Sequence, residues 1–231
     1  MKAADWPTAD DADAMLQALG KWKVKPSPRQ LRLFCVGCCR LVWKLLEAPM
    51  QQAVETAERF ADGQATDVEL AAAHDGEMRR NRSRFDKQGI LYGRGDEGPH
   101  GRTVAKWAYE ATEATTRAGK PVPSKVTMAV RWLGVSAGAP DVGAPALQAA
   151  VLRDIVGNPT APVLLDAAWR SPTAVELAQA IDTDRAFDRL PILADALEDA
   201  GCTNRAVLDN CRGSGPHGRG CWVVDLVLGK S

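Results

Sequence analysis

The stretch SPRQLRLFCVGCCRLVWKLLEAP, residues 27–49, predicts a long amphipathic helix. Ser27 is a favourable N-cap residue, Pro28 suits the first helical position, and Gln30 completes a capping box three residues after the serine. Apolar residues then recur at the helical period of 3.6 residues. Because Pro49 restricts the residue before it, we expect this helix to end by residue 48.

The same pattern of caps and apolar periodicity continues on both sides of this stretch, while strand-like alternation between hairpin turns is nearly absent. The sequence therefore predicts an all-α fold, an irregular bundle of about nine helices whose N- and C-terminal parts pack together. The helices are expected over residues 28–48, 50–61, 67–78, 103–117, 124–133, 146–156, 172–181, 190–200 and 206–210. The apolar run at residues 221–228 fits either type of element.

Two segments interrupt the helical pattern. Residues 79–102 are rich in arginine and glycine and predict an exposed loop. Residues 134–145 contain three glycines and two prolines and predict a connection between an N-terminal part, residues 1–133, and a C-terminal part, residues 146–231. One continuous domain is the alternative.

Composition excludes several classes of protein. The 231 residues contain 29 basic and 29 acidic side chains, so the chain has no overall field that would attract nucleic acid or an anionic membrane. No apolar run is long enough to span a bilayer, and the N-terminus turns acidic at once, unlike a secretory signal. We therefore expect a cytoplasmic protein without a membrane partner, in which the six cysteines are thiols.

The pentapeptide GPHGR occurs twice, at residues 98–102 and 215–219, and carries two of the three histidines, His100 and His217. An arginine–glycine pair precedes each copy by a few residues. A glycine- and proline-shaped loop with an imidazole and a guanidinium suits binding of an anion or a partner, and it matches no known catalytic motif. The simpler interpretation is a pair of surface turns whose polar side chains face solvent.

The cysteines fall into two groups. Cys35, Cys38 and Cys39 share one face of the predicted helix and are interpreted as small core residues. The C-terminal group forms the spacing Cys-x8-Cys-x5-His-x3-Cys, which supplies four ligands for a tetrahedral zinc site, although the specific Cys-x-x-Cys knuckle is absent. The candidate zinc ligands are Cys202, Cys211, His217 and Cys221, with Cys38 and Cys39 as alternates. On this hypothesis the two termini meet in one thiol-lined hub.

Arginines are the candidates for anion binding. Four crowd together after residue 78, and one closes each copy of the pentapeptide, which suits contacts to phosphate or to a nucleic-acid backbone. The alternative for the basic run is a solvated helix end. The candidate residues are Arg79, Arg80, Arg82, Arg84, Arg102 and Arg219.

Four motifs resemble an uncharacterised family of paralogous bacterial proteins. They are LRLFCxxCCR at residues 31–40, AERFADG at 57–63, FDRLPILADALE at 187–198 and CRGxGPHxRGCW at 211–222. The resemblance covers both ends of the chain well and residues 78–143 poorly. It implies kinship without a mechanism, since no activity is established for that family.

Without a nucleophile, P-loop, dinucleotide or metalloprotease motif, we expect no catalytic residues, no cofactor and no enzyme activity. The first hypothesis is a helical protein-interaction or regulatory module whose partner is another protein. The alternative is a zinc-stabilised domain that binds phosphate or nucleic acid. A third hypothesis, an enzyme that uses His100 and His217 together, requires the two pentapeptide loops to converge.

Overall fold

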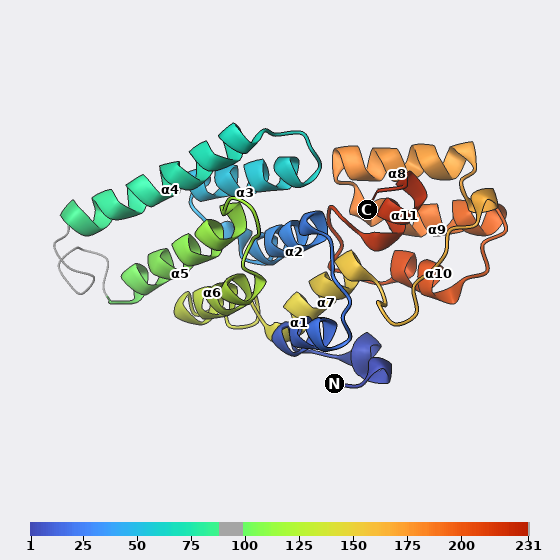
Figure 1. Ribbon diagram of the computed structural model, residues 1–231, viewed down its shortest axis with the longest axis horizontal. Coiled ribbons are helices and arrows are strands. Elements are labelled where there is room, and N and C mark those ends of the chain that lie inside the picture. The colour runs from blue at the N-terminus through green and yellow to red at the C-terminus, as the bar shows by residue number, and fades with distance from the viewer. Residues whose placement is uncertain (88–98, 231) are drawn as a thin grey trace.

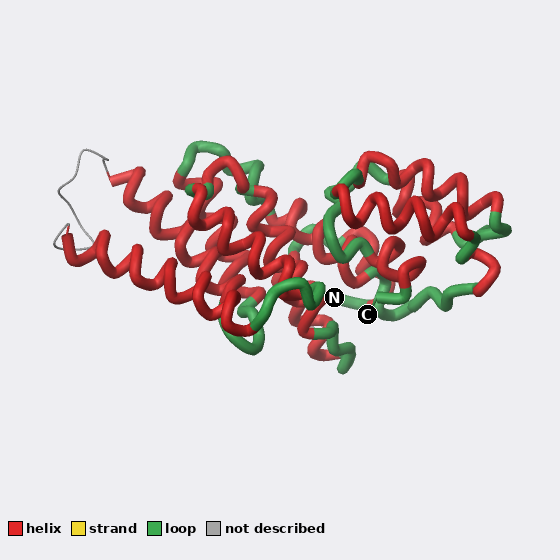
Figure 2. The backbone as a smooth tube through the Cα atoms, turned by 90° about the horizontal axis from the view of Figure 1, so that it is seen from above, coloured by secondary structure: helices red, strands yellow, loops and turns green. Residues whose placement is uncertain are grey.

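The chain is all-α over the residues that the structure describes, which confirms the predicted fold class. The structure is a computed structural model that describes residues 1–87 and 99–230, without the side chains of residues 77, 78, 80–87 and 99–107. Figures 1 and 2 show two groups of helices arranged side by side along the longest axis. Within the described residues none of the helices is both long and apolar enough to cross a membrane.

The larger group, called here the first bundle, comprises the helices up to residue 156 and is coloured blue to yellow in Figure 1. Its elements are η1 (Ala3–Thr8), α1 (Ala12–Lys21), α2 (Pro28–Leu41), η2 (Trp43–Leu45), α3 (Ala48–Ala61), α4 (Asp67–Lys87), α5 (Pro99–Thr116), α6 (Pro123–Ser136) and α7 (Pro145–Val156).

The second bundle, coloured orange to red, follows an irregular segment at residues 157–166. Its elements are η3 (Ala167–Trp169), α8 (Pro172–Asp184), η4 (Phe187–Arg189), α9 (Leu190–Asp199), α10 (Arg205–Arg212) and α11 (Trp222–Leu228). The sequence pattern missed α1, which is capped by the side chain of Asp11, and left α11 open between helix and strand.

Helix α2 is the centre of the first bundle, because it packs against α3, α5, α6 and α7. The predicted capping box is present: the Gln30 amide donates to the Ser27 hydroxyl oxygen, and the Ser27 amide donates to the Gln30 side chain. The helix ends at Leu41, earlier than expected. There the chain tightens into the 3-10 turn η2, which Gln51 holds by donating to the carbonyl of Trp43.

Helices α4 and α5 correct the prediction of a loop over residues 79–102. Helix α4 continues to Lys87 and α5 begins at Pro99, so only residues 88–98 of that segment lie outside the described residues. Arginine and lysine are good helix formers, and no glycine or proline interrupts residues 77–87. The two helices also pack against each other.

Among the side chains that the structure describes, the apolar core forms two separate clusters, one per bundle, and they divide after α7. The predicted connecting segment 134–145 instead turns back within the first bundle, where a side chain at Gly143 would meet the carbonyl oxygen of Val130.

The expected thiol-lined hub is wrong, because Cys35, Cys38 and Cys39 belong to the first cluster and the other three cysteines to the second. Each group is buried within its own bundle, which confirms that the first three are core residues.

The two bundles nevertheless pack together, as the fold prediction stated. Helix α11 contacts α7, and the guanidinium of Arg29 on α2 binds both carboxylate oxygens of Asp225 on α11, at 2.5 and 3.1 Å. A glycine just before α11, Gly220, approaches the side chains of Leu33 and Ile155. The contact between the bundles is therefore both polar and apolar.

Candidate functional site

A pocket of about 320 Å³ lies where the two bundles meet. Helices α2, α3 and α7 contribute from the first bundle; the turn after α8 and the loop between α10 and α11, residues 213–221, contribute from the second. Its apolar wall comprises Leu33, Val36, Val151, Ile155 and Phe187.

Charged side chains form the polar part of the same pocket. Three arginines from three different elements line it, Arg40 on α2, Arg185 after α8 and Arg219 in the 213–221 loop. The carboxylate of Glu58 on α3 lies beside two of them and is only 2% exposed. It accepts a hydrogen bond from Arg40 at 3.0 Å and another from Arg185.

The three arginines repel one another although each has a carboxylate partner. These partners are Glu55 and Glu58 for Arg40, Glu58 for Arg185 and Asp62 for Arg219. Burial, followed by the charges of Arg40 and Arg219, lowers the pKa of Arg185 to about 10. Burial also lowers the pKa of Arg40, and the charge of Arg219 contributes to that shift. The buried Nε of Arg40 has no hydrogen-bond acceptor among the described residues. An acidic ligand in the pocket would relieve the repulsion between the arginines.

Arg219 has partners in both bundles. Its guanidinium donates to the backbone carbonyl of Asp182, and it lies 3.5 Å from the carboxylate of Asp62 and 3.3 Å from the amide oxygen of Gln64. These contacts hold the 213–221 loop against the first bundle with the arginine at the pocket.

The backbone of Arg185 is in the left-handed conformation, with φ 54° and ψ 32°. Glycine and asparagine adopt this conformation most easily, whereas other residues are disfavoured there by about 1–2 kcal/mol. Helix α8 thus ends at a residue whose backbone is strained and whose charge is repelled by Arg40 and Arg219. Such strain clusters at functional sites.

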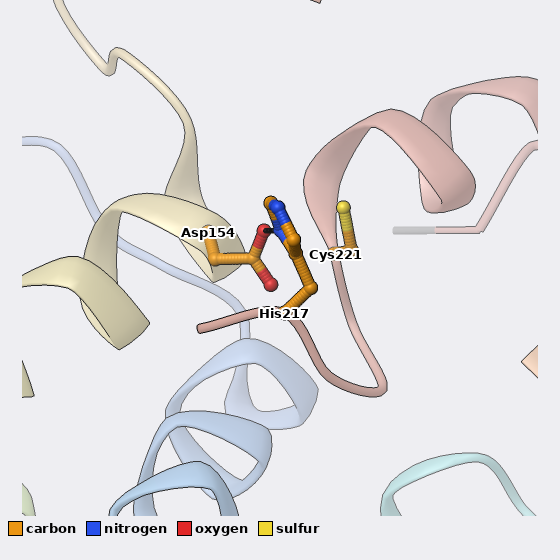
Figure 3. A group of neighbouring side chains, drawn as sticks. All are labelled: Asp154, His217 and Cys221. Atoms are coloured by element: carbon orange, nitrogen blue, oxygen red, sulfur yellow. Dashed lines mark hydrogen bonds and ion pairs between the residues drawn. The ribbon is translucent and has the colours of Figure 1, made fainter. Parts of the chain in front are cut away.

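A second group of polar side chains borders the pocket and is shown in Figure 3. Nδ1 of His217 lies 2.6 Å from Oδ1 of Asp154, which is buried on α7, and Nε2 lies 3.2 Å from the carbonyl oxygen of Gly213. The amide of Gly218 donates to the other oxygen of Asp154 at 3.2 Å. The thiol of Cys221 completes a group whose carboxylate, imidazole and sulfur atoms all lie within 4.8 Å of one another.

Burial alone would lower the pKa of His217, but the hydrogen bond and the charge of Asp154 outweigh it and raise the pKa above its ordinary value. Burial raises the pKa of the Cys221 thiol well above its ordinary value, with the charge of Asp154 adding to the effect. The Cys221 thiol donates to the amide oxygen of Asn210 at 3.5 Å.

The predicted zinc ligands are thus only partly brought together. His217 and Cys221 join the group, whereas Cys202 and Cys211 do not, and the alternates Cys38 and Cys39 lie in the other core cluster. The sequence pattern missed Asp154, a single acid within the apolar helix α7. Nothing in the sequence pairs that residue with the pentapeptide 63 positions later.

Of the predicted anion-binding residues, Arg219 lines the pocket. Arg79 is exposed and donates to the carbonyl of Asp75 on its own helix. The side chains of Arg80, Arg82, Arg84 and Arg102 lie outside the described residues, as does that of His100. Sequence reasoning did not select Arg40, Arg185 and Glu58 as site residues. Arg40 and Glu58 nevertheless fall within the motifs at residues 31–40 and 57–63.

Comparison of the chain with protein-family models, with curated proteins and with solved structures finds no match. The resemblance carried by the four sequence motifs therefore stays a prediction.

Proposed function

We propose that this chain is a non-enzymatic binding module that recognises an acidic group, carboxylate or phosphate, presented by a partner protein in the pocket between its two bundles. The observation that carries the proposal is the convergence of Arg40, Arg185 and Arg219 in one pocket, where Arg40 and Arg185 share the buried carboxylate of Glu58. Arginine is the side chain best suited to planar, two-point recognition of carboxylate and phosphate.

The dimensions of the pocket support a small ligand group. A volume of about 320 Å³ is at the lower end of the range for small-molecule sites. It suits one side chain or one small molecule, with the apolar wall around Val36 and Phe187 holding the carbon part and the arginines holding the acidic part. A partner protein would therefore insert a single acidic or phosphorylated residue.

The lining of the pocket favours binding over catalysis. Among the described residues that line it there is no serine, threonine, cysteine or lysine to act as a nucleophile. The carboxylate of Glu58 already accepts from two arginines, and both ring nitrogens of His217 are hydrogen-bonded. Asp154, the other carboxylate of the lining, is bound to His217 and to the amide of Gly218. The carboxylates and the imidazole that line the pocket thus already have partners.

Titration calorimetry with phenyl phosphate, benzoate and the neutral analogue benzyl alcohol tests this proposal. We expect both acids to bind and the neutral analogue not to bind. The variants Arg40→Gln and Arg185→Gln should each weaken binding about tenfold or more, since each removes a charge-assisted hydrogen bond. Arg189→Gln is the matched control, because Arg189 is an exposed arginine close to Arg185 in sequence that does not line the pocket.

Equal affinity for benzyl alcohol, no binding of either acid, or an equal loss in the Arg189 control would contradict the proposal. Peptides with a glutamate or phosphotyrosine, and a short single-stranded oligonucleotide, then distinguish the partners. Tighter binding of the oligonucleotide than of either peptide would favour the alternative of a nucleic-acid-binding domain over a protein partner.

A further inference from the structure

The short contact between His217 and Asp154 places a hydrogen or a metal ion between the ring and the carboxylate. A backbone carbonyl only accepts hydrogen bonds, so Nε2 must carry a hydrogen to bond the carbonyl of Gly213. In a neutral ring with hydrogen on Nε2, Nδ1 has none, yet it lies 2.6 Å from a carboxylate oxygen. Two lone pairs cannot face each other at that distance, so a proton or a metal ion lies between them.

From this arrangement we propose a second site, in which a divalent metal ion of the zinc class replaces that proton and is bound by Asp154, His217 and Cys221. The ligand atoms are the carboxylate Oδ1, the ring Nδ1 and the thiolate sulfur. A mixture of sulfur, nitrogen and oxygen ligands suits Zn²⁺ or Co²⁺, whereas Mg²⁺ and Ca²⁺ prefer oxygen alone.

The surroundings already have the contacts that usually orient metal ligands. A metal-bound histidine donates its other ring N–H to a backbone carbonyl or a carboxylate, as Nε2 of His217 does to Gly213. A metal-bound carboxylate is itself hydrogen-bonded, as Asp154 is by the amide of Gly218. Both outer contacts can persist when the metal enters.

The movement that the site requires is small. With zinc–nitrogen and zinc–oxygen bonds of about 2.0–2.1 Å in tetrahedral geometry, the two ligand atoms lie roughly 3.3 Å apart. The ring and the carboxylate must therefore separate by less than about 1 Å. The sulfur of Cys221, now within 4.8 Å, must approach to about 3.6 Å from the nitrogen. The loop that carries both His217 and Cys221 contains three glycines between residues 215 and 220.

Charge also balances in this site. Asp154 is buried and has no lysine or arginine partner within the described part of the chain, so its only cationic partner is His217. Metal binding releases two protons, the one between ring and carboxylate and the one on the thiol. The resulting complex of M²⁺, neutral imidazole, carboxylate and thiolate has no net charge, which suits a buried position. This site does not depend on anion binding in the pocket.

Titration of the full, metal-stripped chain with Co²⁺ in the presence of a phosphine reductant tests the proposal. We expect one equivalent to bind, with a thiolate-to-cobalt charge-transfer absorption and the release of two protons into weakly buffered solution. Zn²⁺ should displace Co²⁺ and thereby abolish the absorption. Elemental analysis of protein purified without chelator should give about one zinc per chain.

Cys221→Ser should abolish the charge-transfer absorption, and Asp154→Asn should weaken Co²⁺ binding at least 10- to 100-fold, the loss typical of an outer contact alone. Cys202→Ser is the matched control, a buried thiol of the same core cluster that lies outside the group, and should keep the absorption. Circular dichroism checks that each variant is folded.

The proposed site is contradicted if wild-type protein binds no Co²⁺ or binds it without a thiolate absorption. It is also contradicted if the control variant Cys202→Ser lacks the absorption. These outcomes are decided on the wild type and the control, so they hold even where Cys221→Ser fails to fold.

Discussion

Asp154 and His217 join the two bundles through a contact of 2.6 Å, although 63 residues separate them in the sequence. Asp154 lies on the last helix of the first bundle, and His217 lies in the loop that leads into the last helix of the second. The same loop places Arg219 at the pocket. We therefore expect a change in the protonation of this pair to affect both the contact between the bundles and the position of Arg219.

The pair predicts a pH dependence of stability in the metal-free protein. Because the pKa of His217 is raised in the folded state, the folded chain binds the proton of this residue more tightly than the unfolded chain does. This stabilisation is fully present below the unfolded pKa of about 6.5 and is lost as pH rises through the higher folded pKa. Urea unfolding of wild type and His217→Gln in chelator should show a difference in free energy that shrinks above neutral pH.

His74→Gln provides the control for that measurement, since His74 is half-buried and bonds the hydroxyl of Thr116 in the first bundle. A difference between wild type and His217→Gln that grows with rising pH would show that the pair is not an imidazolium–carboxylate pair.

Gly220 predicts a steric limit on the contact between the bundles. Its φ is +85°, and an added Cβ would lie 2.7 Å from Cδ1 of Leu33 and 3.0 Å from Cδ1 of Ile155. We expect Gly220→Ala to lower the free energy of unfolding by about 2 kcal/mol or more, from backbone strain and overpacking together. Gly218→Ala in the same loop has open space around it and should change stability by less than about 0.5 kcal/mol. Equal effects of the two substitutions in urea unfolding would contradict this account.

The six cysteines predict an unreactive native state. All are buried, and burial raises the pKa of Cys39 to about 11 and that of Cys211 to about 12. Because the thiolate is the reactive form, a disulfide reagent at pH 8 should modify native protein only as fast as the chain opens, and all six thiols in denaturant. Thr173→Cys adds an exposed thiol that should react at once. Rapid reaction of any native wild-type thiol would contradict the burial.

Local features of the fold could be predicted because their causes lie within a few residues. The cap at Ser27 is determined by neighbours in the sequence, and it is present. The extension of α4 could not be predicted in the same way. Its polar residues 79–87 have little amphipathic pattern, and packing against α5 contributes to the choice of helix over loop.

The candidate site depends on tertiary contacts, and most of it could therefore not be predicted from the sequence. The pentapeptide drew attention to His217 and Arg219, which do line the pocket. Glu58 and Arg185 lie 127 residues apart, and nothing near either residue indicates that they meet. The expectation of a common thiol-lined hub was wrong for a related reason. The spacing of cysteines in the sequence does not indicate in which of the two core clusters a helix is buried.

Substitutions at Arg185 distinguish the contribution of this residue to ligand binding from its contribution to the free energy of unfolding. Its left-handed backbone and its position in the pocket predict that its side chain contributes to ligand binding, in addition to its ion pair with the buried carboxylate of Glu58. Arg185→Asn and Arg185→Ala both remove the charge, but asparagine accepts the left-handed conformation more readily than alanine. We expect Arg185→Asn to be more stable than Arg185→Ala by about 0.5–1 kcal/mol in urea unfolding.

Binding of phenyl phosphate should fall about equally in the two Arg185 variants, because the guanidinium is absent from both. Stability and affinity are thus expected to vary independently at one position. If affinity instead follows stability, with the asparagine variant binding nearly as tightly as wild type, Arg185 acts on the ligand only through the shape of the turn after α8, and the pocket recognises acids through Arg40 and Arg219 alone.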